Sequence, residues 1–132
     1  MGKTRAALAL EVRQLEIELR AGVYPGIRVD LPPHNRHWFI SEVEGERVGF
    51  ACLSVDENRL VGVLCRCWVH PSYRSNGVGA GLWEAREALA KELHVPLLQV
   101  IVHNDDAEEK YLSRGFRVQA ALERGRRLLV RP

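Results

Sequence analysis

The stretch of sequence that decides the fold passes from an apolar segment through an arginine and two glycines into a second apolar segment: Val69-His70-Pro71-Ser72-Tyr73-Arg74-Ser75-Asn76-Gly77-Val78-Gly79-Ala80-Gly81-Leu82. The spacing of apolar residues changes at the glycines, which predicts a strand, a tight turn and a helix. Glycines let a ligand approach the backbone, and the free N–H groups at a helix N-terminus favour an anion. The pattern therefore favours a phosphate-binding turn, although the same glycines also suit a plain strand-to-helix turn.

Arg74 adds a fixed positive charge beside this turn. A dinucleotide-binding fingerprint is excluded, because it needs a third glycine where Leu82 stands.

The apolar pattern on either side of the turn predicts the remaining elements. A first helix carries Leu8, Val12, Leu15 and Leu19, and a proline-rich connection follows from 23 to 35. Further elements are three strands (38–44, 47–55, 60–69), a helix (78–93), a strand (97–102), a helix from Asn104 or Asp105 to 114, and a hairpin (116–122, 127–130). In the helix 78–93, Leu82, Ala85, Leu89 and Leu93 form the apolar face and Arg86 lies outside it. The order α-βββ-α-β-α-ββ predicts an α/β fold with a mixed sheet.

Composition excludes several classes of protein. The chain has 132 residues, of which 46% are apolar, and a formal net charge of +2. This length fits one domain, 1–132, and the small charge argues against nucleic acid as a partner. The three cysteines do not make a disulfide framework, and no apolar run is long enough for a secretion signal or a membrane span. We therefore expect a cytoplasmic protein without a membrane partner.

A second motif follows the strand 97–102. It reads Asn104-Asp105-Asp106-Ala107-Glu108-Glu109-Lys110-Tyr111-Leu112-Ser113-Arg114-Gly115-Phe116. Ala107 and Tyr111 are four residues apart and so share one face of a helix. A tyrosine at such a place is most often a core residue with its hydroxyl in solvent.

Together the two motifs resemble the GNAT-type N-acetyltransferase superfamily. Its acetyl-CoA motif is matched by Arg74-Ser75-Asn76-Gly77-Val78-Gly79, and its second half by Asn104, Ala107, Tyr111, Gly115 and Phe116. The resemblance covers about residues 38–122. It implies a GNAT-like, mostly antiparallel sheet with helices on both faces and a splay between the fourth and fifth family strands.

The resemblance also implies the reaction. Acetyl-CoA would be the co-substrate, and an acetyl group would move by direct attack to a primary amine of a small molecule or a protein. Tyr111 matches the usual proton donor to the CoA thiolate, and no metal is expected. The cofactor-binding positions comprise Asn104, the pantetheine-pairing strand Cys67, Trp68 and Val69, and Arg74 with the backbone amides of Ser75, Asn76, Gly77, Val78, Gly79 and Ala80.

The general base is not identified by the motifs. Many family members place a glutamate where Val63 and Gln99 stand here, and neither of these side chains can accept a proton. Four alternatives remain open: His103, His70, and a water relay to Glu42 or Asp56.

Other readings of the sequence stay open as well. The missing glutamate motivates a noncatalytic acyl-CoA-binding or regulatory domain, and the terminal arginines 124, 126, 127 and 131 motivate a polyanion-binding module. Cys65 and Cys67 fit core packing better than a metal site or an acyl-enzyme nucleophile. The segment 34–37, with two histidines, is expected to be irregular. The acceptor amine and a homodimer are not decided; the first helix, the proline-rich connection and the last hairpin would bind the acceptor.

Overall fold

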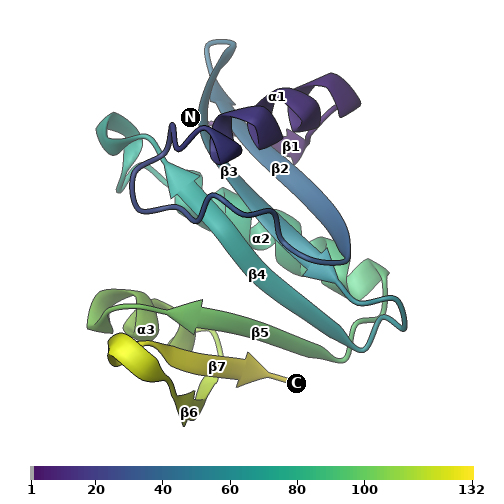
Figure 1. Ribbon diagram of the computed structural model, residues 1–132, viewed down its shortest axis with the longest axis vertical. Helices are drawn as coiled ribbons and strands as arrows, with labels where there is room; N and C mark the ends of the chain where they lie inside the picture. Colours follow the sequence, from purple (N-terminus) through teal and green to yellow (C-terminus); the bar gives the residue numbers. More distant parts are fainter. Residues whose placement is uncertain (1) are drawn as a thin grey trace.

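The computed structural model describes residues 2–132, which form one seven-stranded sheet with strand order β1-β2-β3-β4-β5-β7-β6 (Figure 1). All neighbouring strands are antiparallel except β4 and β5, which are parallel. This arrangement confirms the predicted GNAT-like fold class. The elements are β1 (Lys3–Ala6), α1 (Ala9–Arg20), β2 (Asn35–Val43), β3 (Glu46–Val55), β4 (Val61–Val69), η1 (Pro71–Tyr73), α2 (Val78–Glu92), β5 (Leu97–Val102), α3 (Asp105–Leu112), β6 (Arg117–Ala121), η2 (Glu123–Gly125) and β7 (Arg127–Arg131).

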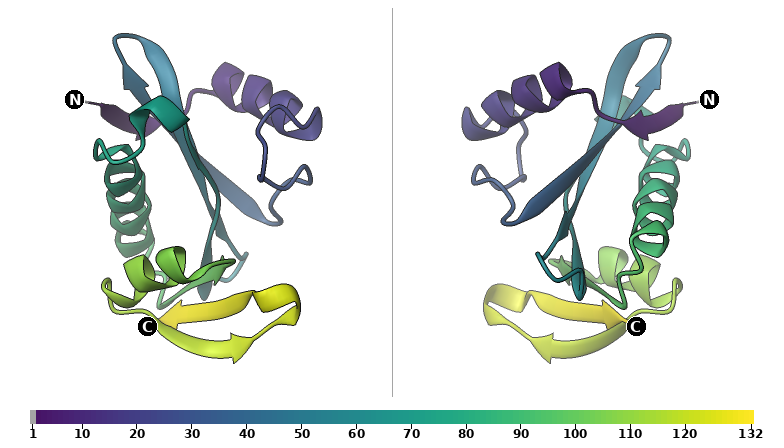
Figure 2. Two further views of the ribbon diagram at one scale, coloured as in Figure 1. Left: turned by 90° about the vertical axis from the view of Figure 1, so that its left-hand side faces the viewer. Right: turned by 90° about the vertical axis from the view of Figure 1, so that its right-hand side faces the viewer.

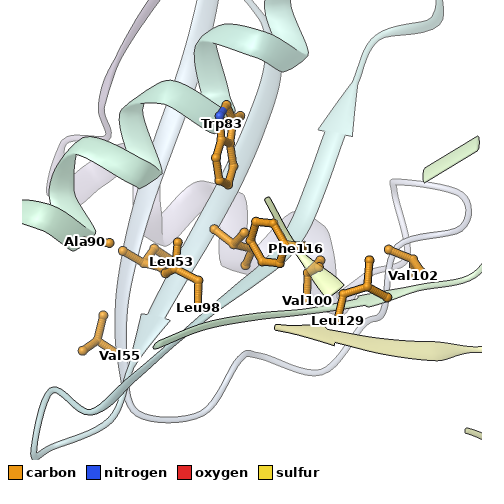
Figure 3. Close-up of a cluster of buried hydrophobic side chains, with 10 residues drawn as sticks. Leu53, Val55, Trp83, Ala90, Leu98, Val100, Val102, Phe116 and Leu129 are labelled. Atoms are coloured by element: carbon orange, nitrogen blue, oxygen red, sulfur yellow. The ribbon is translucent and has the colours of Figure 1, made fainter. Parts of the chain in front are cut away.

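Helices cover both faces of the sheet, with α1 on one face and α2 and α3 on the other (Figure 2). Leu15 and Leu19 of α1 are buried against Phe50 on the first face. On the second face, Trp83 of α2 packs with buried side chains of β3, β5 and β7 and with Phe116 (Figure 3). Burial of a side chain of this size contributes about 1.5–3 kcal/mol. The cluster around Trp83 therefore holds α2 against the sheet where β4 and β5 pair.

Strand β1 is absent from the sequence-based prediction. It has four residues, too few to display an apolar alternation, and it pairs with β2 from Lys3↔Glu42 to Ala6↔Phe39. The guanidinium of Arg5 lies 2.5 Å from the Glu42 carboxylate and supports this pairing. Tertiary contacts, rather than a local pattern, create this edge strand.

The segment 34–37 is also different from the prediction. Strand β2 begins at Asn35, so Arg36 and His37 lie in a strand and pair with Ser54 and Leu53 of β3. The prediction of an irregular segment was wrong here, because pairing with β3 outweighs the weak local strand signal.

Helix α2 contacts the core through the predicted face, with Leu82 buried and Ala85, Leu89 and Leu93 half-buried, but its most buried row is a neighbouring one. Val78, Leu82, Arg86 and Ala90 follow one another at intervals of four and are all buried. The placement of Arg86 on the polar face was wrong: its side chain is fully covered, with 1% of the residue exposed. Arg86 stands in the middle of the stripe, beneath the part of the sheet where the strands diverge.

In the part of the chain that the structure describes, none of the helices is both long enough and apolar enough to cross a membrane.

Candidate active site

Strands β4 and β5 form a splay. Their parallel pairing extends only from Val61↔Leu97 to Leu64↔Val100, and beyond this point the strands separate (Figure 1). The expected splay is thus confirmed. Past Leu64, the edge of β4 that faces β5 offers backbone N–H and C=O groups to a ligand.

A bulge interrupts β4 inside the splay. Phe50 pairs with Trp68 but Cys52 pairs with Cys65, so Arg66 and Cys67 together face one residue of β3. Arg66 has a φ of 49°, in the left-handed region that side chains rarely adopt. The bulge breaks the two-residue alternation.

Because of this bulge, Cys65 is half-buried whereas Cys67 is exposed. Core packing was therefore the wrong prediction for Cys67. Cys52, the neighbour of Cys65 on β3, is fully buried, and the Cys65 thiol together with this burial raises the pKa of Cys52. Cys52 therefore remains a protonated thiol and packs in the core.

A cavity of about 660 Å³ occupies the splay. Its walls come from β4 and the end of β5, from one face of α3, and from the connection between α1 and β2. Ser54 of β3, Arg86 of α2 and Arg126 of the last hairpin complete them. Cys67, Asn104 and Tyr111, three of the predicted site residues, border this cavity from different elements. The structure therefore brings part of the predicted pantetheine strand to one place with Asn104, Ala107 and Tyr111 of the second motif.

The connection between α1 and β2 is held over the cavity by polar contacts. The Ser54 hydroxyl donates to the carbonyl oxygen of Pro33, and Arg66 donates to the carbonyl oxygen of Asp30 at 2.9 Å. Tyr24 donates from its hydroxyl to Glu18 at 2.5 Å; burial, followed by this hydrogen bond, raises the pKa of Tyr24 to about 12. These contacts make the connection an ordered wall.

The turn at residues 74–80 has the backbone of an anion site. Ser75 and Gly77 have φ values of 71° and 83°, and such left-handed residues curve the backbone so that successive N–H groups converge. The first N–H groups of α2, those of Val78, Gly79 and Ala80, have no partner within the helix. A Cβ on Gly79 would meet nothing within 4 Å. The space above this turn is therefore open to a ligand.

The turn is anchored from below and from the side. Val78 is buried against Gly49 of β3, where an added Cβ would lie 3.0 Å from Val78 Cγ1 and 3.1 Å from the Trp68 carbonyl oxygen. Arg74 donates from Nε to the Val69 carbonyl oxygen at 3.1 Å, which ties the turn to the end of β4. The side chain of Trp68 lies away from the turn and stacks on Phe50 with 5.7 Å between ring centroids.

Tyr111 and Asn104 have defined structural surroundings. The ring of Tyr111 packs against Phe116 and Trp83, with centroid separations of 5.2 and 6.1 Å. Asn104 caps α3, because its Oδ1 accepts a hydrogen bond from the Ala107 backbone N–H at 2.8 Å. Both residues therefore hold fixed positions on the wall of the cavity.

Of the four candidate bases, His103 borders the cavity. The other three side chains have structural partners outside the cavity wall. Glu42 pairs with Arg5, His70 Nδ1 accepts from the Ser72 N–H at 3.0 Å, and Asp56 accepts from two backbone N–H groups, of which that of Val61 lowers the Asp56 pKa most. Val63 and Gln99 lie opposite each other in the paired part of β4 and β5.

Sequence reasoning missed the arginines around the cavity. Arg28, Arg66 and Arg86 border it together with Arg126, and Asp30 supplies the one carboxylate among its described lining residues. Asp30 forms ion pairs with Arg28 at 2.7 Å and Arg66 at 3.4 Å. The signal for Arg86 was its position four residues after Leu82 and four before Ala90, in the row that contacts the sheet.

Comparisons with known proteins agree with this geometry. A family model described as "Acetyltransferase (GNAT) family" matches residues 9–116. A search of curated proteins gives no match. N-acetylglutamate synthase from Neisseria gonorrhoeae, complexed with coenzyme A and N-acetyl-glutamate, is similar over 99% of this chain and 35% of its own, with TM-score 0.77 and 20% identity.

Two shorter proteins are similar over nearly their whole length. A GNAT-family acetyltransferase from Streptococcus pneumoniae has TM-score 0.79 and 19% identity over 99% of this chain and 98% of its own. The ribosomal-protein-S18-alanine N-acetyltransferase from Escherichia coli has TM-score 0.76 and 20% identity over 100% and 94%. These likenesses agree in fold, and the family match covers most of the chain, including both motifs. The chain therefore belongs to the acetyltransferase (GNAT) family, whose co-substrate is acetyl-CoA.

Proposed function

We propose that this chain, as one domain of residues 1–132, transfers an acetyl group from acetyl-CoA to a primary amine. The observation that carries the proposal is the cavity in the splay, which Cys67, Asn104 and Tyr111 border, together with the turn at 74–80, where left-handed Ser75 and Gly77 curve the backbone at the start of α2. The backbone N–H groups of the turn would hold the pyrophosphate, and the free edge of β4 from Cys67 to Val69 would pair with the pantetheine arm. The thioester would then lie inside the cavity.

The reaction is a direct displacement. The neutral amine attacks the thioester carbonyl carbon, a C–N bond forms, and the C–S bond breaks as the electrons move to sulfur. Backbone N–H groups of β4 stabilise the charge that develops on the carbonyl oxygen. The Tyr111 hydroxyl, which borders the cavity, donates its proton to the CoA thiolate.

His103 is the proposed acceptor of the proton that the amine loses. It lies on the wall of the cavity, unlike Glu42, Asp56 and His70. A neutral imidazole carries one ring nitrogen with a free lone pair, which can accept this proton.

The test begins with binding and then measures turnover. Calorimetry with acetyl-CoA and CoA should give saturable binding, and CoA thiol release should rise above background with at least one member of an amine panel. Tyr111→Phe should lower kcat about 100-fold, in line with the loss of general acid catalysis. Tyr73→Phe is the matched control, because Tyr73 does not border the cavity. Absence of binding at millimolar ligand would overturn the proposal.

Two further variants separate the mechanisms. Cys67→Ser should retain turnover if the amine attacks directly, whereas loss of turnover together with trapping of an acetylated cysteine would indicate an acyl-enzyme. His103→Gln should lower kcat about 100-fold, as expected for the loss of a general base, while the Kd of acetyl-CoA stays within twofold.

A noncatalytic acyl-CoA-binding domain is the second candidate function. The observation that favours it is the lack of a glutamate at Val63 and Gln99, with Asp30 already paired to two arginines. Tight acetyl-CoA binding without thiol release across the amine panel would support this candidate over the enzyme.

A further inference from the structure

Arg86 is a buried cation without an acidic partner. Its residue is 1% exposed, and Nε donates to the carbonyl oxygen of Leu82 in its own helix at 3.2 Å. Nη1 is buried and has no hydrogen-bond partner in the described structure, and no ion pair within residues 2–132 involves Arg86. An unpaired buried charge raises the free energy of the folded state. A guanidinium in this position is therefore expected to have a counterion, which the described residues do not supply.

Arg86 belongs to the wall of the cavity in the splay. Around this cavity four arginines stand against one aspartate, and Asp30 is already paired with Arg28 and Arg66. The excess positive charge of the cavity lies on Arg86 and Arg126. A guanidinium recognises a carboxylate through two parallel N–H···O hydrogen bonds.

The position of Arg86 separates it from the phosphate-binding turn. Arg86 follows Gly77 by nine residues, which correspond to about 13 Å along a helix. A strand covers the same distance in about four residues, so the point of β4 level with Arg86 is about four residues before Val69, at Cys65. Cys65 is next to Leu64, the last residue of β4 that pairs with β5. Arg86 therefore lies at the closed end of the splay, whereas the turn that would hold the phosphates of CoA lies at the other end.

We propose that Arg86 binds a carboxylate carried by one of the two substrates at the closed end of the cavity. The inference rests on the proposed function and deepens it: the enzyme takes either an amine acceptor that bears a carboxylate, as an amino acid does, or an acyl-CoA whose acyl chain ends in one. Because Arg86 is almost fully covered, ligand entry displaces the side chains above the guanidinium.

Binding measurements test the proposal without turnover. In the acyl arm, calorimetry compares succinyl-CoA with butyryl-CoA, which has the same number of acyl carbons and no carboxylate. In the acceptor arm, thermal shift with CoA present compares amino acids with their carboxamides. Wild-type protein should favour the carboxylate member of one arm at least tenfold, and that arm identifies the substrate that carries the group.

Variants then assign the preference to Arg86. Arg86→Met should abolish the preference while the Kd of CoA stays within twofold; Arg86→Lys should retain part of it, because a lysine keeps the charge and loses the bidentate geometry. Lys91→Met is the matched control on the exposed part of α2.

Equal binding of both members in both arms by wild-type protein overturns the inference, and this result needs no variant to fold. A preference that survives in Arg86→Met also overturns it. Turnover without any carboxylate preference supports the proposed function and contradicts the inference. A carboxylate preference that depends on Arg86, without turnover with any amine, supports carboxylate binding by Arg86 and contradicts the proposed enzyme activity.

Discussion

The two ends of the splay differ in the groups that they present: backbone N–H groups at the open end and side chains at the closed end. At the open end, the anion-binding turn presents backbone N–H groups at the exposed start of α2, shaped by Ser75 and Gly77. At the closed end, the cavity is walled by side chains from several separate parts of the chain, with Arg86 buried at its base. A backbone site is encoded by contiguous residues, whereas a side-chain site is encoded by packing. The difference teaches that the backbone geometry of the turn can be predicted from a local motif, whereas the lining of the cavity cannot.

The largest expected effect concerns the support beneath the open end. Gly49→Ala places a Cβ 3.0 Å from Val78 Cγ1 and 3.1 Å from the backbone oxygen of Trp68, which cannot rotate away. Such overpacking costs about 1–3 kcal/mol of the free energy of unfolding. Because Val78 begins α2, the shift also moves the turn. We expect lower stability in urea titration and weaker CoA binding in calorimetry.

The matched control for Gly49 is Gly79, a glycine with ordinary φ and open space around it. If Gly49→Ala leaves the unfolding free energy within about 0.5 kcal/mol of wild type, the usual range for a neutral surface change, then β3 does not hold the turn in place.

Gly79→Ala is the second prediction and isolates the ligand from the fold. Alanine in a helix is more stable than glycine by about 0.5–1 kcal/mol, and here its methyl group meets no protein atom. In the proposed mode of CoA binding, the methyl group would occupy space that the pyrophosphate needs. We therefore expect unchanged or higher stability and a Kd for CoA about tenfold higher, equivalent to about 1.4 kcal/mol.

An unchanged Kd in Gly79→Ala would mean that the phosphates do not approach this residue. The proposal that the open end of the splay binds the cofactor would then be wrong. Lys91→Ala, near the C-terminus of the same helix, controls for the change in helix propensity.

The sequence predicts those helices and strands in which apolar residues recur at a regular spacing. The predicted ends of the strands 38–44, 47–55 and 60–69 and of the helix 78–93 differ from the observed ends by at most three residues. Strand β1 escaped prediction because Lys3–Ala6 has no period to detect and gains its stability from β2. The bulge at Arg66 escaped because a left-handed residue within a strand depends on what the neighbouring strand requires.

The same reasoning separates the site residues. Asn104 and Tyr111 were predicted because their motif is short and contiguous, and both border the cavity. Arg86 was missed because an arginine among glutamates and alanines has the composition of an exposed helix face. Its burial follows from the divergence of β4 and β5 above it, which no window of sequence contains.

The smallest expected effect tests the residue that joins the second motif to the cavity. Asn104→Ala removes the cap of α3 and should cost about 1 kcal/mol of stability. Asn104→Ser keeps an oxygen that can accept the Ala107 N–H, so it should restore most of that loss. A contact between the Asn104 amide and acetyl-CoA predicts that kcat/KM for acetyl-CoA stays several-fold low in both variants. If serine restores kcat/KM as well as stability, Asn104 acts only as a helix cap, and the closed end then owes its chemistry to Tyr111, His103 and Arg86 alone.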